Sequence, residues 1–172
     1  MKFFILMACL ALTACLEKEV KIKPPPLALN EDSLGYYCQM HLLEHEGPKG
    51  QVHLEGYPAP IWFSQVRDGI AHIKSEERIA DIDVFYVNDM GVASNWAKPG
   101  ANNWVDAETA YFVVDSDAIG GMGAPEIVPF ALKDHAQAYA RNRGGSVKRL
   151  HEIKQEDVLA PVEISAIEGA DK

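Results

Sequence analysis

The sequence predicts a mixed α and β domain in which the order strand, strand, helix, strand occurs twice. Three observations support this prediction. Short runs of β-branched and aromatic residues are bounded by glycine and proline turns, apolar residues recur at helical spacing after the second run, and the same pattern returns later in the chain. Because 172 residues are enough for one core, both halves are expected in a single domain.

The first predicted half spans residues 52–87. Its strands are expected at 52–55, 61–63 and 82–87, with a turn at 56–58. Ser64 is expected to cap the helix between the second and third strands, because a serine hydroxyl accepts hydrogen bonds from the free backbone N–H groups of a helix start. The buried side of that helix would carry Val66, Ile70 and Ile73.

The second predicted half spans residues 111–150. Its strands are expected at 111–114, 127–130 and 147–150. The helix between them would place Ala136 and Tyr139 on one side, and Gly144 would end it as a left-handed C-terminal cap. Phe63 and Phe130 take equivalent places just before the two helices, which suggests an ancient duplication.

The N-terminal segment resembles the leader of bacterial lipoproteins. Residues 1–14 carry a single charge, at Lys2, then an apolar run and Leu12-Thr13-Ala14-Cys15, which is similar to a lipobox. The apolar run is well short of the ~20 residues that cross a bilayer as a helix, so an uncleaved membrane helix is disfavoured. The resemblance implies cleavage before Cys15 and a lipid on its sulfur.

This organisation divides the chain into four parts. Residues 1–14 are the predicted signal peptide, 15–34 the lipidated Cys15 and a proline-rich tether, 35–160 the folded domain, and 161–172 a flexible tail. Two or more acyl chains on Cys15 would hold the domain stably on the periplasmic side of a bacterial membrane.

The net charge restricts the classes of partner. It is -9, and loss of Lys2 with the leader makes the remaining chain more acidic by one unit. An acidic chain without a basic run is not expected to bind nucleic acid, or to hold anionic lipid by charge. Membrane attachment is therefore expected through the lipid at Cys15.

Cys38 is the single thiol expected to stay reactive, because Cys9 leaves with the leader and Cys15 is alkylated. Structural cysteines of exported proteins usually come in disulfide pairs. An odd exported thiol indicates either an intermolecular disulfide or a thiol kept for chemistry or metal binding. One open alternative is therefore an adaptor lipoprotein that joins a partner through Cys38 without any metal.

The spacing of the sulfurs favours copper(I). Cys38 and Met40 are two residues apart, which lets both reach one ion from an extended or loop segment, and soft thiolate and thioether donors select copper(I) over magnesium or calcium. Met122 is a third candidate, because glycines flank it on a permissive loop, whereas a packing methionine usually has apolar neighbours. Met90, at the end of a predicted strand, is more ambiguous.

The histidines offer weaker signals. The segment from His41 to His45 matches the H-x-x-E-H pattern of inverted zinc peptidases, but Gly47-Pro48 limits any helix there to about one turn, and a catalytic zinc site needs a third ligand. Either His41 or His45 could still lend a nitrogen to copper near Cys38, although solvated side chains are the simpler interpretation.

Three segments together resemble the NosL family of copper-binding lipoproteins, which assist assembly of nitrous oxide reductase. They are Tyr37-Cys38-Gln39-Met40, the run from Trp104 to Val114, and Gly120-Gly121-Met122-Gly123-Ala124-Pro125. The resemblance implies an α+β fold of two ββαβ-like halves in one compact domain, similar to organomercury lyase. It also implies that Cys38 and Met40 hold copper(I), with Met122 as a third sulfur.

The same resemblance implies a role. The protein would be a periplasmic, membrane-anchored copper(I) chaperone for the copper centres of nitrous oxide reductase, with that enzyme and the membrane-bound Nos ABC transporter complex as partners. Catalysis is not expected. Thiol chemistry of the organomercury lyase kind uses sites with more than one cysteine, and the mature domain would have Cys38 alone.

Overall fold

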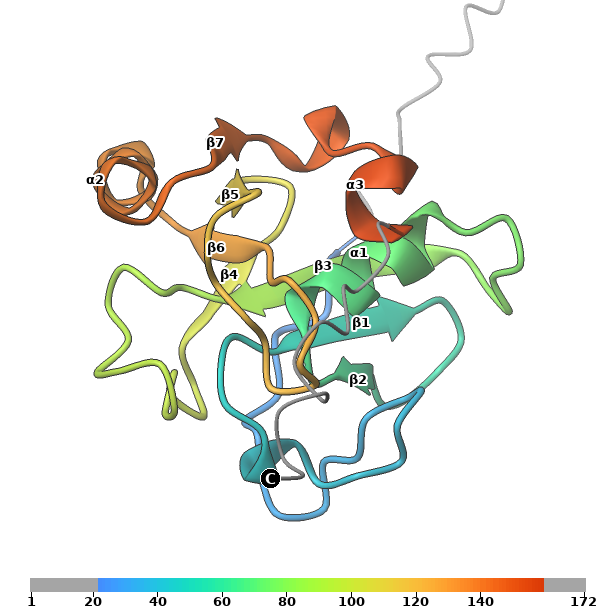
Figure 1. The fold of residues 1–172 in the computed structure, drawn as a ribbon. Helices are drawn as coiled ribbons and strands as arrows, with labels where there is room; N and C mark the ends of the chain where they lie inside the picture. Colours follow the sequence, from blue (N-terminus) through green and yellow to red (C-terminus); the bar gives the residue numbers. More distant parts are fainter. Residues whose placement is uncertain (1–21, 160–172) are drawn as a thin grey trace, which may run out of the picture.

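Two antiparallel sheets, each accompanied by one longer helix, form the framework of the structure, a computed structural model in which residues 22–159 are described (Figure 1). The elements in chain order are η1 Leu42–Glu44, β1 Gly50–Leu54, β2 Ile61–Phe63, α1 Val66–Lys74, β3 Ile82–Asn88, β4 Trp104–Asp106, β5 Tyr111–Val114, β6 Val128–Phe130, α2 Lys133–Arg143, β7 Ser146–Lys148, η2 Leu150–Glu152 and α3 Gln155–Leu159; η1 and η2 are short 3-10 helices.

The two halves share one topology. In the first sheet the strand order is β2-β1-β3-β4, and in the second it is β6-β5-β7. The opening strand of each half, β1 or β5, therefore lies in the middle and pairs antiparallel with the other two strands of its half. A helix connects the second strand to the third in both cases, so the predicted α+β fold of two ββαβ-like halves is confirmed.

Local details differ from the sequence expectation at the helix ends. Ser64 was expected to cap α1, but the residue at the cap position is Gln65, whose side chain makes no capping hydrogen bond. The backbone of Gln65 is extended (φ -130°, ψ 141°), so α1 begins only at Val66, and the Ser64 hydroxyl pairs with a cysteine instead. Gly144 ends α2 with φ 75° but ψ -173°, so it has the expected positive φ without the left-handed helical ψ.

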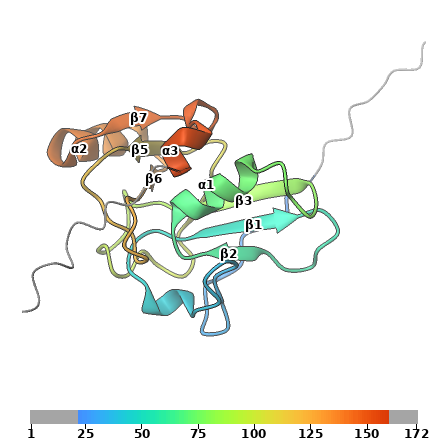
Figure 2. The ribbon, with the colours of Figure 1, turned by 45° about the vertical axis from the view of Figure 1, so that its right-hand side comes forward.

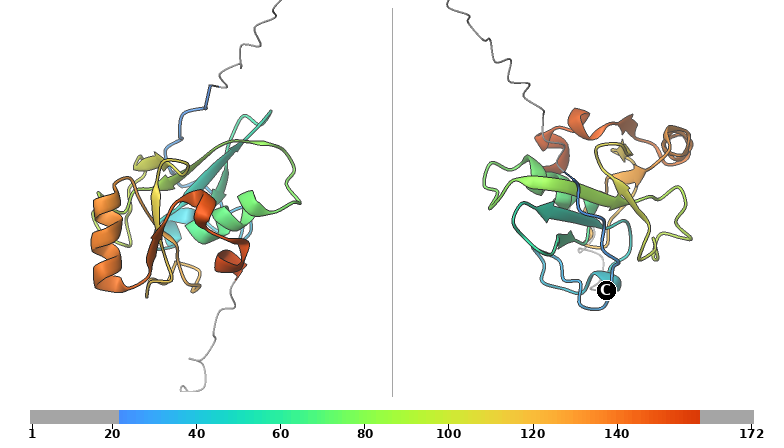
Figure 3. Two further views of the ribbon diagram at one scale, coloured as in Figure 1. Left: turned by 90° about the horizontal axis from the view of Figure 1, so that it is seen from above. Right: turned by 180° about the vertical axis from the view of Figure 1, so that it is seen from behind.

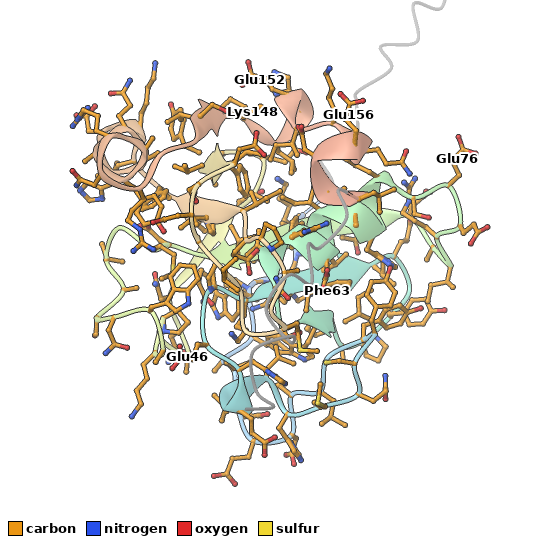
Figure 4. All side chains as sticks on the ribbon, in the orientation of Figure 1. Glu46, Phe63, Glu76, Lys148, Glu152 and Glu156 are labelled. Carbon is orange, nitrogen blue, oxygen red and sulfur yellow. The ribbon has the colours of Figure 1, made fainter. Side chains whose placement is uncertain are left out.

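One apolar cluster joins the two halves. It is centred on residues of both sheets and of α1, including Val52, Phe63, Ile70, Phe85, Phe112 and Ile127. Phe63, labelled in Figure 4, is 1% exposed and lies against Gly69 of α1 and Gly50 of β1. Helix α3 extends the cluster through Val158 and packs on α1, as the view in Figure 2 shows. The shared core explains why the halves form one domain.

The proline-rich segment lies against the domain, contrary to the expected tether. The Gln51 side chain both accepts from Leu27 N (2.8 Å) and donates to Leu27 O (2.9 Å), and Tyr86 Oη donates to Pro24 O (2.9 Å). Leu29 is buried. Seen from behind, the segment crosses the face of the first sheet that α1 leaves open (Figure 3, right). Part of the segment expected as a tether therefore contacts the domain that was expected to begin at residue 35, because the backbone groups of this segment stay free for side chains to bind.

Several expectations lie outside the described residues: the signal peptide 1–14, the lipidated Cys15 and the tail 161–172. Within 22–159, no helix has both the length and the apolar character needed to span a bilayer. The acidic side chains labelled in Figure 4, among them Glu76 and Glu152, are exposed, because burial of an unpaired charge costs free energy.

Candidate metal centre

Cys38 lies in a tight turn that leads from the N-terminal segment to η1. Gly35 N donates to Met40 O (2.9 Å) and Gln39 N donates to Gly35 O (2.9 Å), which closes the turn. Gln39 takes a left-handed backbone with φ 56°, and a Cβ at Gly35 would come within 2.4 Å of Cys38 Sγ. Gly35 therefore lets the chain fold back closely enough to hold the thiol on the inner side of the turn.

Aromatic rings fix the turn to the first sheet. Tyr36 N donates to Trp62 O of β2 (2.7 Å), and Tyr37 Oη hydrogen-bonds His72 Nδ1 of α1 (3.0 Å). The ring of Tyr37 also meets Phe63 edge-on, with centroids 5.7 Å apart. Burial, with a smaller contribution from Arg78, lowers the pKa of His72, so this imidazole is neutral at pH 7 and supports the turn without adding charge.

Met122 sits at the tip of a hairpin between β5 and β6. Gly120 N donates to Ala124 O (2.8 Å), Gly123 N donates to Gly120 O (2.9 Å), and Ile119 and Pro125 form an antiparallel bridge. Gly123 has φ 79°, a conformation that glycine adopts without strain. The Met122 side chain is 40% exposed, so its thioether is accessible rather than packed in the core.

A cavity of about 260 Å³ brings Cys38 and Met122 together. Its wall is made by three segments: the turn (Gly35, Tyr36, Tyr37, Cys38), the end of β2 with the start of α1 (Phe63, Ser64, Gln65, Asp68), and the hairpin (Met122, Ala124). The thiol precedes the first half of the fold and the thioether belongs to the second half. Two soft sulfur donors that are distant in sequence therefore line one cavity, and thiolate and thioether groups are donor types that copper(I) prefers.

Polar groups of the cavity come from the start of α1. Ser64 Oγ lies 3.7 Å from Cys38 Sγ, a distance at which the hydroxyl can donate to a thiolate. Asp68, in the first turn of α1, adds a carboxyl group whose pKa is raised by burial and lowered in part by Arg67. Sequence patterns gave no signal that Ser64, Gln65 or Asp68 would line a cavity, because polar residues after a short strand are typical of an ordinary helix start.

Met40 does not line this cavity, although it is two residues from Cys38. Its side chain is 38% exposed, and its carbonyl oxygen closes the turn with Gly35 N. The turn, with its left-handed Gln39, replaces the extended geometry in which residues i and i+2 share a face. The thioether of Met40 is thus available to solvent next to the turn.

The two candidate histidines are each held by one ring nitrogen. His41 Nδ1 donates to Glu31 O (2.7 Å) and His45 Nδ1 donates to Gly121 O (3.3 Å). Because both acceptors are carbonyl oxygens, the Nδ1 atoms carry protons, and in the neutral ring the lone pair is on Nε2. His45 Nε2 is buried without a hydrogen-bond partner among the described residues. The hydrogen bond from His45 Nδ1 to Gly121 O also connects His45 to the residue before Met122.

The remaining candidates lie elsewhere. Met90 lines a separate cavity of about 550 Å³ with Trp96 and Tyr139. The H-x-x-E-H segment forms only η1, three residues long, and within 22–159 no three His, Cys, Asp or Glu side chains cluster in a way that could hold a metal ion. A peptidase-like zinc site is therefore absent from the described part of the chain, and sulfur is the donor type that the candidate centre offers.

Comparisons with known proteins agree on one family. The family model described as NosL matches residues 26–158. The chain is 48% identical over 172 residues to a copper-binding lipoprotein NosL of Achromobacter cycloclastes (99% of this chain, 89% of that protein), and 36% identical over 145 residues to one of Stutzerimonas stutzeri (84% and 74%). The crystal structure of the copper chaperone NosL from Shewanella denitrificans is similar, with 31% identity and a TM-score of 0.71 over 77% of this chain and 98% of that one. The chain belongs to the NosL family.

Proposed function

We propose that this protein is a copper(I) chaperone, anchored to the periplasmic side of a bacterial membrane by a lipid on Cys15. Cys38, Met40 and Met122 are the proposed sulfur donors. The observation that carries the proposal is that a free thiol of the turn before β1 and a thioether of the hairpin between β5 and β6 line one cavity. The names of the relatives, a copper-binding lipoprotein and a copper chaperone, support the same function.

The charge and softness of the donors suit a monovalent copper cargo. The Cys38 thiolate carries one negative charge, so a thiolate with one or two thioethers and copper(I) is neutral overall. A neutral group loses little free energy when it is partly buried, whereas a divalent ion in the same place would leave a net charge to desolvate. Soft sulfur also disfavours magnesium and calcium, which prefer oxygen ligands.

Accessibility of the donors suits transfer. Met40 and Met122 are 38% and 40% exposed and Cys38 is half-buried, so a sulfur from a partner protein can reach the ion before the donor sulfurs leave it. Exchange of this kind never releases the ion to water. His41 Nε2 or His45 Nε2 could add a nitrogen donor, because each ring already donates its Nδ1 proton to a carbonyl group, as metal-binding histidines do.

The proposed destination is the set of copper centres of nitrous oxide reductase, reached with the membrane-bound Nos ABC transporter complex. A strain that lacks the gene for this chain, complemented with wild type or with Cys38→Ser, tests this destination. We expect copper-poor, inactive nitrous oxide reductase without wild-type protein and under low copper supply. Normal copper content of the enzyme in the deletion strain would refute delivery but would leave copper binding intact.

Copper binding is tested by titration of the reduced full-length protein, purified in detergent, with copper(I) against a competing chelator. Wild type should bind one ion tightly, and Cys38→Ser should lose tight binding, because the thiolate is the single anionic donor of the proposed set. Equal affinities of wild type and a Cys38→Ser, Met40→Leu protein would refute the proposed function.

A second candidate is an adaptor that binds a partner through a disulfide of Cys38. The observation in its favour is that Cys38 is a free and only half-buried thiol. Non-reducing electrophoresis of membranes, after alkylation of free thiols, separates the two functions. Recovery of Cys38 entirely in the free form refutes the adaptor, and a stable mixed disulfide refutes a thiol reserved for copper.

A further inference from the structure

The start of α1 contacts both of the segments that carry the candidate sulfur donors. On one side, Ser64 Oγ lies 3.7 Å from Cys38 Sγ. On the other side, Gln65 Nε2 donates to Ala124 O of the Met122 hairpin (3.4 Å), and Arg67 Nη1 donates to Pro125 O (3.4 Å). Four consecutive residues, 64–67, therefore lie between a turn of the first half and a hairpin of the second.

Burial makes these contacts specific. Ser64 is 3% exposed and Gln65 is 1% exposed, so neither side chain can exchange its partner for bulk water. A Cβ on Gly120 would lie 2.3 Å from Gln65 Nε2, which shows that the amide presses directly on the base of the hairpin. The Glu126 carboxyl oxygen Oε1, at the end of the hairpin, accepts from Arg67 N (3.1 Å) and Ile127 N (2.9 Å) and holds the same base to the helix.

We propose that the start of α1 aligns the metal centre, with Ser64 as the positioning residue for the Cys38 thiol and Gln65 as the positioning residue for the Met122 thioether. The inference rests on the proposed function, because it assumes that these two sulfurs bind copper. Glycines at 120, 121 and 123 make the hairpin intrinsically free to move, and a neutral thioether is a weak donor. Holding the hairpin in place before copper arrives removes an entropic cost from binding.

The test separates the two positioning roles by a double-mutant cycle. Copper(I) affinity is measured by chelator competition for full-length protein carrying Gln65→Leu or Ser64→Ala, each alone and together with Met122→Leu. Loss of one hydrogen bond predicts a ~3- to 10-fold weaker affinity for each single variant. The Gln65→Leu effect should vanish when Met122 is already leucine, whereas the Ser64→Ala effect should persist, because it acts through Cys38.

Gln51→Leu is the matched control. Gln51 is also a fully buried glutamine whose amide holds a chain segment, the one at Leu27, but it lies on the other face of the first sheet. It should lower the urea midpoint about as much as Gln65→Leu does, with wild-type copper affinity. If Gln65→Leu does not fold, Gln65→Asn provides the same test, because it keeps the amide and shortens its reach by one methylene.

The possible outcomes are distinguishable. Equal affinity of Gln65→Leu and wild type, or a Gln65→Leu effect that stays the same in the Met122→Leu background, overturns the positioning role of Gln65. If Gln51→Leu loses as much copper affinity as Gln65→Leu, lowered stability is the cause, and the positioning role of Gln65 is again overturned. If Cys38→Ser and Met122→Leu bind copper as tightly as wild type does, the proposed function is refuted, and the positioning roles of Ser64 and Gln65 are refuted with it.

Discussion

Replacement of Met122 by leucine removes one sulfur and little else. Leucine keeps the apolar character and nearly the volume of methionine, and such swaps usually cost less than ~1.5 kcal/mol of unfolding free energy. At position 122 the cost should be lower still, under about 1 kcal/mol, because the side chain is 40% exposed and makes only part of the contacts of a core residue. The fold and the cavity should therefore persist.

The effect on copper should be larger than the effect on stability. Loss of a group that merely orients a metal ligand costs 10- to 100-fold in affinity, so loss of a ligand itself should cost at least about tenfold, or ~1.4 kcal/mol. Competition with a copper(I) chelator measures the affinity, and stopped-flow transfer to the chelator measures the rate of loss, which we expect to rise. Urea unfolding of the same samples reports the stability.

Met90→Leu is the control for this prediction. Met90 lines the separate cavity of about 550 Å³ beside Trp96, so the same substitution there should leave affinity and transfer rate unchanged. Unchanged copper affinity in Met122→Leu, or an equal loss in Met90→Leu, would refute the reasoning that the cavity shared by Cys38 and Met122 is the copper site.

Three further predictions follow from neighbouring features. Met40→Leu should also weaken copper binding, with no measurable loss of stability because Met40 is 38% exposed; wild-type affinity in chelator competition would exclude Met40 as a donor. Gly120→Ala should destabilise the fold by about 1–3 kcal/mol and weaken copper binding, because the added Cβ would lie 2.3 Å from Gln65 Nε2 and 2.7 Å from Glu126 Oε2, two groups that cannot move into solvent. The Cβ added in Gly123→Ala meets open space, so this variant should lose only ~1 kcal/mol, for its positive φ. Equal urea midpoints of the two variants would contradict the packing around Gly120. Burial raises the pKa of Glu126 from its ordinary value of 4.5 to about 8. Between these pH values the folded state therefore binds more protons than the unfolded state. The contribution of Glu126 to the unfolding free energy falls as pH rises from about 4.5 to about 8. Glu126→Gln should remove that fall, by on the order of a few kcal/mol, in urea unfolding at pH 5 and pH 8; parallel pH profiles of the two proteins would show that the carboxyl group is not buried in this way.

The strand and helix order of both halves was predictable because it depends on local patterns. Tyr111–Val114 is a run of aromatic and β-branched residues that ends at the polar Asp115, and it forms β5 with the expected bounds. β4, which covers Trp104–Asp106, was not predicted as a strand, because it has only two apolar residues in succession, between the polar Asn103 and Asp106. Helix α3 was missed for a similar reason: its five residues form a helix because Val158 packs into the core beside α1, not because of their spacing.

The N-terminal segment shows a second reason why the structure differs from the sequence expectation. Pro24-Pro25-Pro26 is typical of an unpacked linker in any reading of composition, yet the segment covers β1 through the side chain of Gln51. Gln51 precedes the strand that was expected at 52–55, and a polar residue at the end of a strand usually faces water. Only the structure shows that both faces of β1 are covered, since all five of its residues are buried.

The candidate site was predictable as a set of donor types rather than as a geometry. Cys38 and Met122 were identified by chemistry, a lone thiol and a glycine-flanked thioether, and the structure brings both to one cavity. Met40 was paired with Cys38 by their spacing in an extended or loop segment. The left-handed Gln39 changes the geometry between them, and Met40 does not line the cavity, so its role as a donor stays a prediction. Ser64 and Gln65 could not be identified, because their contacts depend on how two halves distant in sequence pack together.

X-ray absorption at the copper K edge counts the sulfur atoms that hold one copper(I) ion and so tests most directly whether both halves of the fold donate to it. Full-length protein loaded with one equivalent of copper(I) should show a thiolate and thioether environment that loses one sulfur in Met122→Leu and keeps its full sulfur number in Met90→Leu. The same copper–sulfur coordination number in wild type and Met122→Leu would contradict a site shared between Cys38 and Met122.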